Sequence, residues 1–417
     1  MQSQDQVHDT VDHLFRHQAG QMVSILTRRF GIANVELIED AVQDAMIAAL
    51  KKWPYSDVPE NRSAWLIQVA KNRVLDQLRR GRKSESIEAR DLEFQTSVNT
   101  ELHFDTELNE DQLRMIFACC HPAIPSDSQV ALTLKIVGGF SVGEIASAYL
   151  AKEEAVAKML TRAKQKLRDI QFEIPAGDEL IERLDSVLRV LYLMFSEGYT
   201  ASEGDHLLRR DLSFEAIRLV GMVADHPKVS NPKTNALAAL FLFQAARFPT
   251  RADGDGELSL LADQDRSKWD KQMIVTALKQ FRLSAAGNAV SDYHLEAEIA
   301  SLHSLSPDFV STDWVRIIEC YDELQSRRFS PVVALNRAVA IGQFNGPEAA
   351  LSELSSLAGN YMMTAFNLFH ITKAHFLAEI GDRDAAITSC ERAIELTRNE
   401  SIKRFLTRRI AVLTSME

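Results

Sequence analysis

The 417-residue sequence predicts an all-α protein, and three observations lead to that prediction. Apolar residues recur at spacings of three and four along most of the chain, as they do on the buried side of an amphipathic helix. We find no convincing alternation of apolar and polar residues, the pattern typical of strands, and expect no strands. A pattern of helix, tight turn and helix is repeated near the C-terminus. We therefore expect two small helical domains followed by an α-solenoid-like domain of helical repeats.

The N-terminal part contains two amphipathic helical patterns. The first runs through residues 38–50 and ends at Trp53-Pro54, because the residue before proline avoids the helical conformation. The second begins near Trp65 and ends at Gly81, a typical helix stop signal. Residues 85–106 are acidic and lack periodicity, which indicates an extended linker. Helical pattern resumes at Asp111.

Residues 141–170 have the spacing of a helix-turn-helix. Ser141 and Glu144 form a capping-box sequence at the start of a short helix that runs to about Tyr149. After a brief turn, a longer helix over 153–170 carries an apolar stripe and a basic stripe. Lys158, Arg162 and Lys166 lie four residues apart, so we expect them on one outward face. An ordinary pair of packed helices is the alternative interpretation.

The C-terminal repeat has an offset of 36 residues. Ala338 matches Ala374, and residues 349–351 match residues 385–387. Ser330-Pro331 supplies an N-cap and a proline at the first helical position. The offset is close to the ~34-residue tetratricopeptide period, so we expect a short tetratricopeptide-like solenoid.

Charge is distributed unevenly along the chain. The formal net charge is −11, which argues against a chain that coats nucleic acid by bulk charge. However, residues 71–83 hold six basic side chains against one acidic, and residues 158–168 hold five against none. Nine acidic residues lie between Ser84 and Asp111, where Arg90 is the only Lys or Arg. The net charge therefore conceals two basic patches separated by an acidic segment.

Composition bounds the class of protein. Four cysteines in 417 residues form no disulfide framework, which fits a reducing compartment. The N-terminus lacks the basic and apolar regions of a signal peptide, and no apolar stretch reaches the length of a membrane span. We expect a cytoplasmic protein without a membrane partner.

Other candidate sites give weaker signals. Cys119-Cys120-His121 invites a zinc interpretation, but adjacent cysteines do not easily ligate one ion, so buried thiols beside a helix end are expected instead. Residues 253–257 resemble a calcium loop without its twelfth-position acid, and we interpret them as an acidic turn. Residues 263–270 form a polar and aromatic cluster that is either a binding site or a salt-bridged helix cap. No catalytic or phosphate-binding motif is found, so we expect no enzyme activity, no cofactor and no metal.

Several segments together resemble the conserved regions of bacterial sigma factors. The segments are LIEDAVQDAMIAALKKW (37–53), NRSAWLIQVAKNRVLDQLRR (61–80), QVALTLKIVGGFSVGEIASAYL (129–150) and VAKMLTRAKQKLRD (156–169). The most similar type is the extracytoplasmic-function class, which keeps only regions two and four. VLYLMFSEGY (190–199) and GELSLLADQDRSKWD (256–270) resemble the subgroup with a long helical-repeat extension at the C-terminus.

The resemblance implies roles for residues at matching positions. Region two of the family binds the coiled coil of the polymerase largest subunit. In this sequence, the resemblance places Asp40, Gln43 and Asp44 at the positions that make this contact. The positions that melt and read the −10 element are Asn61, Trp65, Asn72, Arg73, Asp76, Arg79 and Arg80, with a flipped base entering near the loop of residues 53–61. The second helix of region four reads the −35 element through Ala155, Lys158, Met159 and Arg162, and Lys166 lies on the same predicted face.

These observations predict a domain order and a function. We expect a region-two-like domain at 1–83, an acidic linker at 84–107, a region-four-like domain at 108–170 and a helical-repeat domain at 171–417. The expected function is that of a sigma factor that binds core RNA polymerase and promoter DNA, with the C-terminal domain as a regulatory module that contacts another part of the chain or a protein partner. The alternative is a stand-alone helix-turn-helix transcription regulator whose repeat domain senses a ligand or partner.

Overall fold

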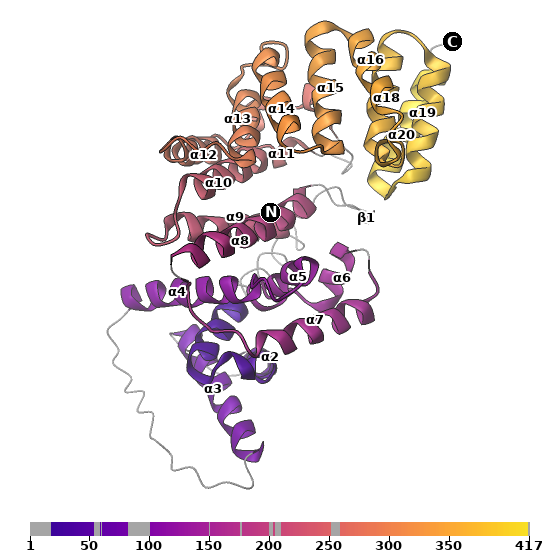
Figure 1. Cartoon of the computed structure of the whole chain (residues 1–417). Helices are drawn as coiled ribbons and strands as arrows, with labels where there is room; N and C mark the ends of the chain where they lie inside the picture. Colours follow the sequence, from indigo (N-terminus) through magenta and orange to yellow (C-terminus); the bar gives the residue numbers. More distant parts are fainter. Residues whose placement is uncertain are drawn as a thin grey trace. The chain divides into compact units, whose positions relative to one another are not determined.

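A computed structural model describes most of the chain and divides it into two compact units. It describes residues 18–53, 59, 61–81, 101–149, 151–175, 177–199, 203–204, 210–251 and 259–415. Unit 1 spans Met1–Leu193 and unit 2 spans Met194–Glu417. Nearly all the described residues are helical, which confirms the predicted all-α class (Figure 1).

Unit 1 is a bundle of helices. It begins with a helix over residues 18–30. The elements that follow are η1 (Ile32–Asn34), α2 (Val35–Lys52), α3 (Arg62–Gly81), α4 (Glu101–Cys119), α5 (Ser126–Ile136), α6 (Val142–Tyr149), α7 (Glu153–Leu167) and the first part of α8 (Asp178–Tyr199).

The helix boundaries of unit 1 follow local sequence signals in most places. The capping box is confirmed: the Glu144 N–H donates to Ser141 Oγ (3.1 Å), and the Ser141 N–H donates to Glu144 Oε2 (2.7 Å). One boundary differs, because α4 begins at Glu101 instead of Asp111. The acidic residues between Glu101 and Asp111 show no apolar periodicity in the sequence. Acidic residues are nevertheless favourable in the first turns of a helix, so this segment is compatible with helix formation.

Two long-range contacts hold unit 1 together. The helix over residues 18–30 passes so close to the end of α5 that a Cβ added to Gly20 would lie 2.0 Å from the carbonyl oxygen of Val137. Arg183 of α8 is buried, and its Nη2 donates to the carbonyl oxygen of Phe117 in α4 at 2.5 Å. The first part of α8 is therefore anchored within unit 1, beyond the predicted domain end at residue 170, and that domain boundary stays a prediction.

Unit 2 is an array of short helices with two dipeptide strands. Its elements after α8 are β1 (Glu203–Gly204), α9 (Arg210–Asp225), α10 (Pro232–Ala245), α11 (Phe248–Arg251), η3 (Leu261–Asp263), η4 (Arg266–Lys268), α12 (Lys271–Ser284), α13 (Asp292–Leu305), α14 (Trp314–Arg327), α15 (Pro331–Asn345), α16 (Pro347–Leu357), α17 (Tyr361–Thr364), α18 (Asn367–Glu379), α19 (Arg383–Leu396), β2 (Arg398–Asn399) and α20 (Glu400–Ser415).

The 36-residue repeat corresponds to two helix pairs. Helix α15 begins at Pro331 and α18 at Asn367, while α16 begins at Pro347 and α19 at Arg383, so both members of the pair are offset by 36. The matched alanines of the repeat are all buried, at 0–1% exposure: Ala338 with Ala374, and Ala350 with Ala386. Small buried side chains let the paired helices approach closely, as repeat packing requires. The helices of the array stand side by side in Figure 1.

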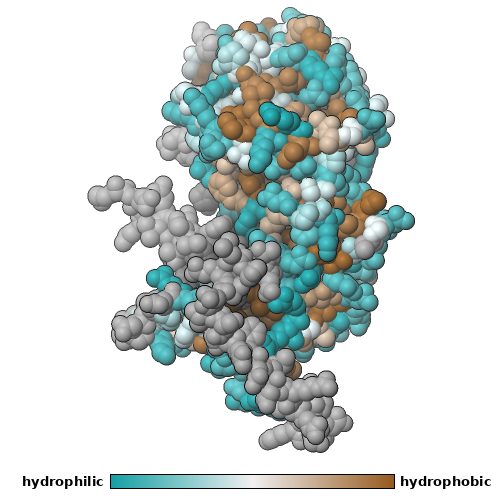
Figure 2. Space-filling view, turned by 90° about the vertical axis from the view of Figure 1, so that its left-hand side faces the viewer, coloured by the Kyte–Doolittle hydropathy of each residue, from teal (hydrophilic) through white to brown (hydrophobic). Residues whose placement is uncertain are grey.

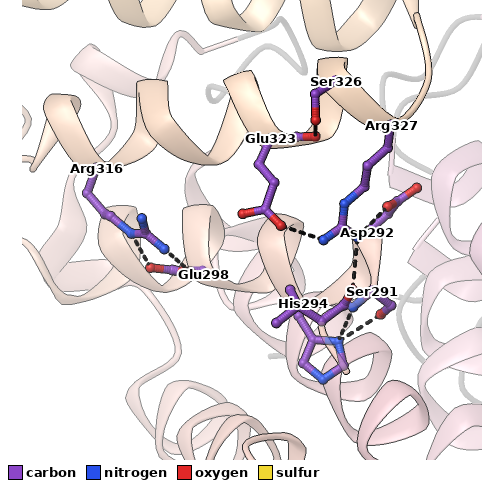
Figure 3. A network of polar contacts seen from close by, with 9 residues as sticks. Ser291, Asp292, His294, Glu298, Arg316, Glu323, Ser326 and Arg327 are labelled. Atoms are coloured by element: carbon purple, nitrogen blue, oxygen red, sulfur yellow. Dashed lines mark hydrogen bonds and ion pairs between the residues drawn. The ribbon is translucent and has the colours of Figure 1, made fainter. Parts of the chain in front are cut away.

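Arginine side chains fix the register between successive helices of unit 2. Arg316 of α14 donates two hydrogen bonds to Glu298 of α13, at 2.6 and 3.0 Å. Arg327, also in α14, donates to Asp292 of α13 at 3.0 Å and to Glu323 at 2.5 Å (Figure 3). Such bidentate and bridging pairs are geometrically specific, so they align α14 on α13.

A histidine links α13 to the preceding helix. His294 Nδ1 accepts a hydrogen bond from the Ser291 N–H at 3.1 Å, and its other ring nitrogen donates to the carbonyl oxygen of Ser284 at the end of α12 (3.1 Å). Burial lowers the pKa of His294, which keeps the ring neutral and able to accept the first of these bonds.

A short parallel pairing of β1 with β2 departs from the expectation of no strands. Glu203 pairs with Arg398 and Gly204 with Asn399. The strands contain two residues each, too few for an apolar–polar alternation to show in the sequence. Asn399 is fully buried, and its Oδ1 accepts the Ile402 N–H at 3.1 Å, so the same residue caps the first turn of α20.

The described surface is polar with scattered apolar residues. Among the described residues, no helix combines the length and apolar character that crossing a bilayer requires. On the face shown in Figure 2, hydrophobic residues form small patches between hydrophilic ones. Single exposed apolar residues are normal for a protein surface.

We predict that Gly342→Ala destabilises unit 2. A Cβ at Gly342 of α15 would lie 2.5 Å from the buried ring of Phe376 in α18 and 2.8 Å from the Cβ of Ala350 in α16. Overpacking a core of this kind typically costs about 1–3 kcal/mol. Gly221→Ala in α9 is the matched control, because nothing lies within 4 Å of its added Cβ. Urea unfolding of both variants should show a lower midpoint for Gly342→Ala only; equal midpoints would contradict the packing.

Candidate nucleic-acid interface

Helix α3 presents a polar and basic face. Its apolar side is buried against α2 through residues such as Leu66, Ala70 and Val74, each fully buried. This packing leaves four predicted DNA-binding side chains exposed: Asn72, Arg73, Arg79 and Arg80. Asp76, the one acidic residue of the patch, is exposed beside them. Exposed guanidinium groups in this arrangement are suited to phosphate contacts.

Trp65 lies at the N-terminal end of the same helix and is half-buried. Its ring centroid is 5.6 Å from that of Trp53, and Lys52 Nζ lies 5.9 Å from its ring centroid. Asn61 is exposed, and its Oδ1 accepts the Ala64 N–H at 2.9 Å, which holds the first turn of α3. Most of the predicted base-entry loop, residues 54–58 and 60, lies outside the described residues.

The structure adds Gln68 to this face. Gln68 is exposed, and its Nε2 donates to Asn72 Oδ1 at 3.1 Å. Residues 61, 65, 68 and 72 follow one another at helical spacing, so they form a single stripe of polar and aromatic side chains. Gln68 could have been predicted from the sequence, because it lies three residues after Trp65 and four before Asn72.

Helix α2 carries the predicted polymerase-binding residues on its outer side. Asp40 and Gln43 are exposed and Asp44 is half-buried. Ile47 and Leu50 follow at helical spacing and are 48% and 62% exposed. Asp44 also lies 3.7 Å from Arg73 of α3, so the predicted polymerase-binding and DNA-binding faces adjoin. An exposed strip with apolar and acidic side chains is the kind of surface that a partner protein covers.

Helix α7 separates a buried stripe from an exposed one. Val156, Leu160, Ala163 and Leu167 are 0–3% exposed and pack against α5 and α6. The predicted DNA-binding residues on the other side are all exposed: Ala155, Lys158, Arg162 and Lys166. Met159, which the resemblance places among the −35-reading residues, is half-buried between them.

The exposed stripe of α7 borders a groove of about 510 Å³. The groove is lined by Ala155, Lys158, Met159, Arg162, Ala163 and Lys166 from α7 and by Pro125 and Ser128 at the start of α5. Lys166 Nζ donates to the carbonyl oxygen of Ala123 at 3.0 Å, which links α7 to the segment between α4 and α5. Pro125 and Ser128 were absent from the sequence-based prediction because they are distant from α7 along the chain.

Ion pairs connect α7 to α2. Lys164 Nζ lies 2.6 Å from Glu39 Oε2, and both side chains are mostly buried, at 14% and 10% exposure. One turn further along, Arg168 Nη2 lies 2.5 Å from Glu36 Oε2, in a pair that is 46% and 41% exposed. Because α3 packs against α2 as well, the two predicted DNA-contacting helices, α3 and α7, are both attached to α2.

The candidate metal sites do not assemble in the described chain. Cys119 and Cys120 are fully buried at the end of α4, as expected for structural thiols. Burial raises the pKa of Cys120 to about 12 and that of Cys119 well above its usual value, which disfavours the thiolate that binds metal. No group of three or more metal-ligating side chains forms among the described residues. Residues 253–257 lie outside the described residues.

The cluster at residues 263–270 contains two kinds of side chain: acids that cap helices, and an arginine and a tryptophan that point inward. Asp265 accepts the Ser267 N–H (3.0 Å) in η4, and Asp270 accepts the Met273 N–H (2.9 Å) at the start of α12. The helix-cap interpretation is therefore correct for these two acids. Arg266 and Trp269 point into unit 2, where Trp269 is 3% exposed.

Comparison with known proteins agrees with this geometry. Residues 14–84 match the family of sigma-70 region 2. Residues 183–285 match a family of unknown function (DUF6596). The chain is also 36% identical over 387 residues to an uncharacterised protein of Rhizobium meliloti (strain 1021), an alignment that covers 91% of this chain and 90% of that relative. No solved structure matches the chain.

The chain belongs to the sigma-70 family of transcription initiation factors, with an additional C-terminal domain. The region-2 match covers the helix of residues 18–30, α2 and α3. Among these helices, α2 carries the predicted polymerase-binding residues and α3 carries the exposed arginines Arg73, Arg79 and Arg80.

We predict that Glu39→Gln destabilises unit 1 by about 3 kcal/mol, because it leaves the Lys164 ammonium mostly buried without its carboxylate. The double variant Glu39→Gln/Lys164→Met should recover part of this loss, since no charge is then buried. Arg168→Gln is the control: its pair with Glu36 is largely exposed, so it should change stability by less than about 1 kcal/mol. Equal losses in the two single variants, measured by urea unfolding, would contradict this ranking.

Proposed function

We propose that this protein binds core RNA polymerase through α2, opens the −10 element of a promoter with α3 and contacts the −35 element with α7. The observation that carries the proposal is the sigma-70 region 2 match over residues 14–84. The matched helices expose polar and acidic side chains on α2 for a protein contact and basic side chains on α3 for a DNA contact. The protein acts by binding and base capture and uses no covalent chemistry.

The charge distribution supports DNA contact at α3 and α7. The predicted DNA-binding arginines and lysines of both helices are held outward by buried stripes on the opposite side. Phosphate contacts from such residues position a protein on the duplex, while base contacts specify the sequence. On α7, the groove beside Lys158 and Arg162 offers a surface that a base edge can reach.

Trp65 supports base capture at the start of α3. Flipping a base out of the stack costs a few kcal/mol, which stacking on an aromatic ring offsets. Trp65 is half-buried against Trp53, so its orientation is fixed before DNA arrives. Asn61, Gln68 and Asn72 lie along the same stripe and offer hydrogen bonds to an unpaired base.

Run-off transcription with purified core polymerase tests the proposal. The full-length protein should direct a promoter-specific product, and absence of product from every candidate promoter would argue strongly against it. A gel shift on the same DNA, with and without core enzyme, separates this proposal from a stand-alone helix-turn-helix regulator. The proposal expects a shift only with the polymerase, because the overall charge of −11 opposes DNA binding by the free chain.

We predict that Arg79→Gln/Arg80→Gln slows open-complex formation roughly 10- to 30-fold at 0.15 M salt, since two phosphate contacts and their counterion release are lost. The slope of log rate against log salt concentration should also become shallower. Arg189→Gln, which removes an exposed charge from α8 of the same unit, is the control. An unchanged rate in the double variant would remove these arginines from the proposed interface.

We further propose that unit 2 regulates the sigma activity of unit 1. Unit 2 has its own buried core and a helical-repeat array, an architecture suited to binding a peptide or protein partner. This role is independent of the residues proposed to contact DNA, all of which lie in unit 1.

We predict that a chain ending at Leu193 differs from the full-length protein in run-off transcription. Ending at Leu193 instead of near Arg168 keeps the Arg183 hydrogen bond to Phe117 and the buried part of α8 that stabilises unit 1. Higher activity than full length would mean that unit 2 inhibits, and lower activity would mean that it is required. Equal activity and equal polymerase affinity would contradict a regulatory role.

A further inference from the structure

Three arginines gather around two aromatic rings in unit 2, in a place that the proposed function does not use. We call Arg247, Arg251 and Arg266 the arginine cluster. Arg247 lies between α10 and α11, Arg251 ends α11, and Arg266 begins η4. All three residues are half-buried.

The rings of Trp269 and Tyr199 hold the arginine cluster in place. The guanidinium carbons of Arg247 and Arg266 lie 5.5 and 4.9 Å from the Trp269 ring centroid. That of Arg251 lies 3.9 Å from the Tyr199 ring centroid. Trp269 is itself fixed, because its Nε1–H donates to Thr250 Oγ1 at 2.8 Å. Cation–π stacking of this kind orients guanidinium planes but does not neutralise their charge.

Arg247 and Arg266 bond to neutral groups. Arg247 Nε donates to the side-chain amide oxygen of Gln264 at 3.2 Å. Arg266 Nη1 donates to the carbonyl oxygens of His303 and Ser306. Within the part of unit 2 that the structure describes, neither residue forms an ion pair with a carboxylate.

The arginines of the neighbouring repeats behave differently. Each of three bridges two carboxylates: Arg316 pairs with Glu298 and Glu319, Arg327 with Asp292 and Glu323, and Arg337 with Asp322 and Glu353. These three arginines are thus neutralised by carboxylates of their own chain. Arg247 and Arg266 differ, because no carboxylate forms an ion pair with either among the described residues, and the charge of Asp308 acts on Arg266 only from a greater distance.

Unsatisfied polar atoms surround the arginine cluster. Arg266 Nη2, the Tyr199 hydroxyl and His303 Nδ1 are buried without a hydrogen-bond partner among the described residues. Burial and the charges of Arg247 and Arg266 lower the pKa of His303 to about 3, so its ring is neutral and adds no charge. Half-buried cations and unpaired donors are costly unless a ligand satisfies them.

We propose that the arginine cluster binds an oxyanion ligand that carries a carboxylate or phosphate group. Planar guanidinium groups present paired N–H donors that match both oxyanions, and stacking on Trp269 and Tyr199 pre-organises them. The site lies within residues 183–285, which match the family of unknown function. The inference is independent of the sigma activity, because binding is measured without polymerase or DNA.

The test measures thermal unfolding of the full-length protein in sodium phosphate, sodium succinate and sodium chloride at equal ionic strength. At a tenfold excess of the preferred anion over its Kd, the midpoint should rise by about 3–6 °C relative to chloride. A rise in phosphate alone assigns a phosphate ligand, and a rise in succinate alone assigns a carboxylate. Isothermal titration with the same anion gives the Kd directly.

Variants separate a specific site from general salt effects. Arg247→Gln should abolish the anion-dependent rise, and Arg266→Gln provides the same test if the first variant does not fold. Arg392→Gln is the matched control, because Arg392 is a half-exposed arginine of unit 2 paired with Glu395; it should keep the full rise. The proposal is overturned if neither anion raises the midpoint of the wild-type protein, or if the rise persists in Arg247→Gln and Arg266→Gln.

Discussion

The short helices of this chain depend on burying one apolar stripe each. The longest described helix has 22 residues and most are much shorter, so few would be stable alone in water. Each stripe has to meet a complementary one on another helix, as α7 does on α5 and α6 through Val156 and Leu160. On amphipathic helices such as α3 and α7, the opposite side then carries polar residues, which can contact a partner.

This constraint explains how an acidic chain can offer basic surfaces. Burial of Leu66, Ala70 and Val74 turns the arginines of α3 outward, and burial of Leu160 does the same for Arg162 of α7. In unit 2 the same packing rule has another result. There, outward arginines such as Arg316 are paired with carboxylates of the adjacent helix, so their charge aligns neighbours and is not available to a polyanion.

Features encoded within one or two helical turns were predictable from the sequence. The Ser141–Glu144 capping box, the end of α2 before Pro54 and the 36-residue offset of the repeat all depend on local spacing, and all are present. Contacts between distant segments were not predictable. The pairing of Lys164 with Glu39, the position of Ser128 beside α7 and the stacking of Arg247 on Trp269 each join residues that no local pattern relates.

The pairing of β1 with β2 limits how unit 2 can evolve. In an open helical array, duplication of one 36-residue repeat adds a pair of helices and leaves the rest unchanged. Here Glu203–Gly204, at the beginning of the unit, is hydrogen-bonded to Arg398–Asn399, just before its last helix. An inserted repeat would carry these two segments apart and break the pairing. The number of helices between them is therefore fixed by closure, and we expect homologues to vary in loop length before they vary in repeat number.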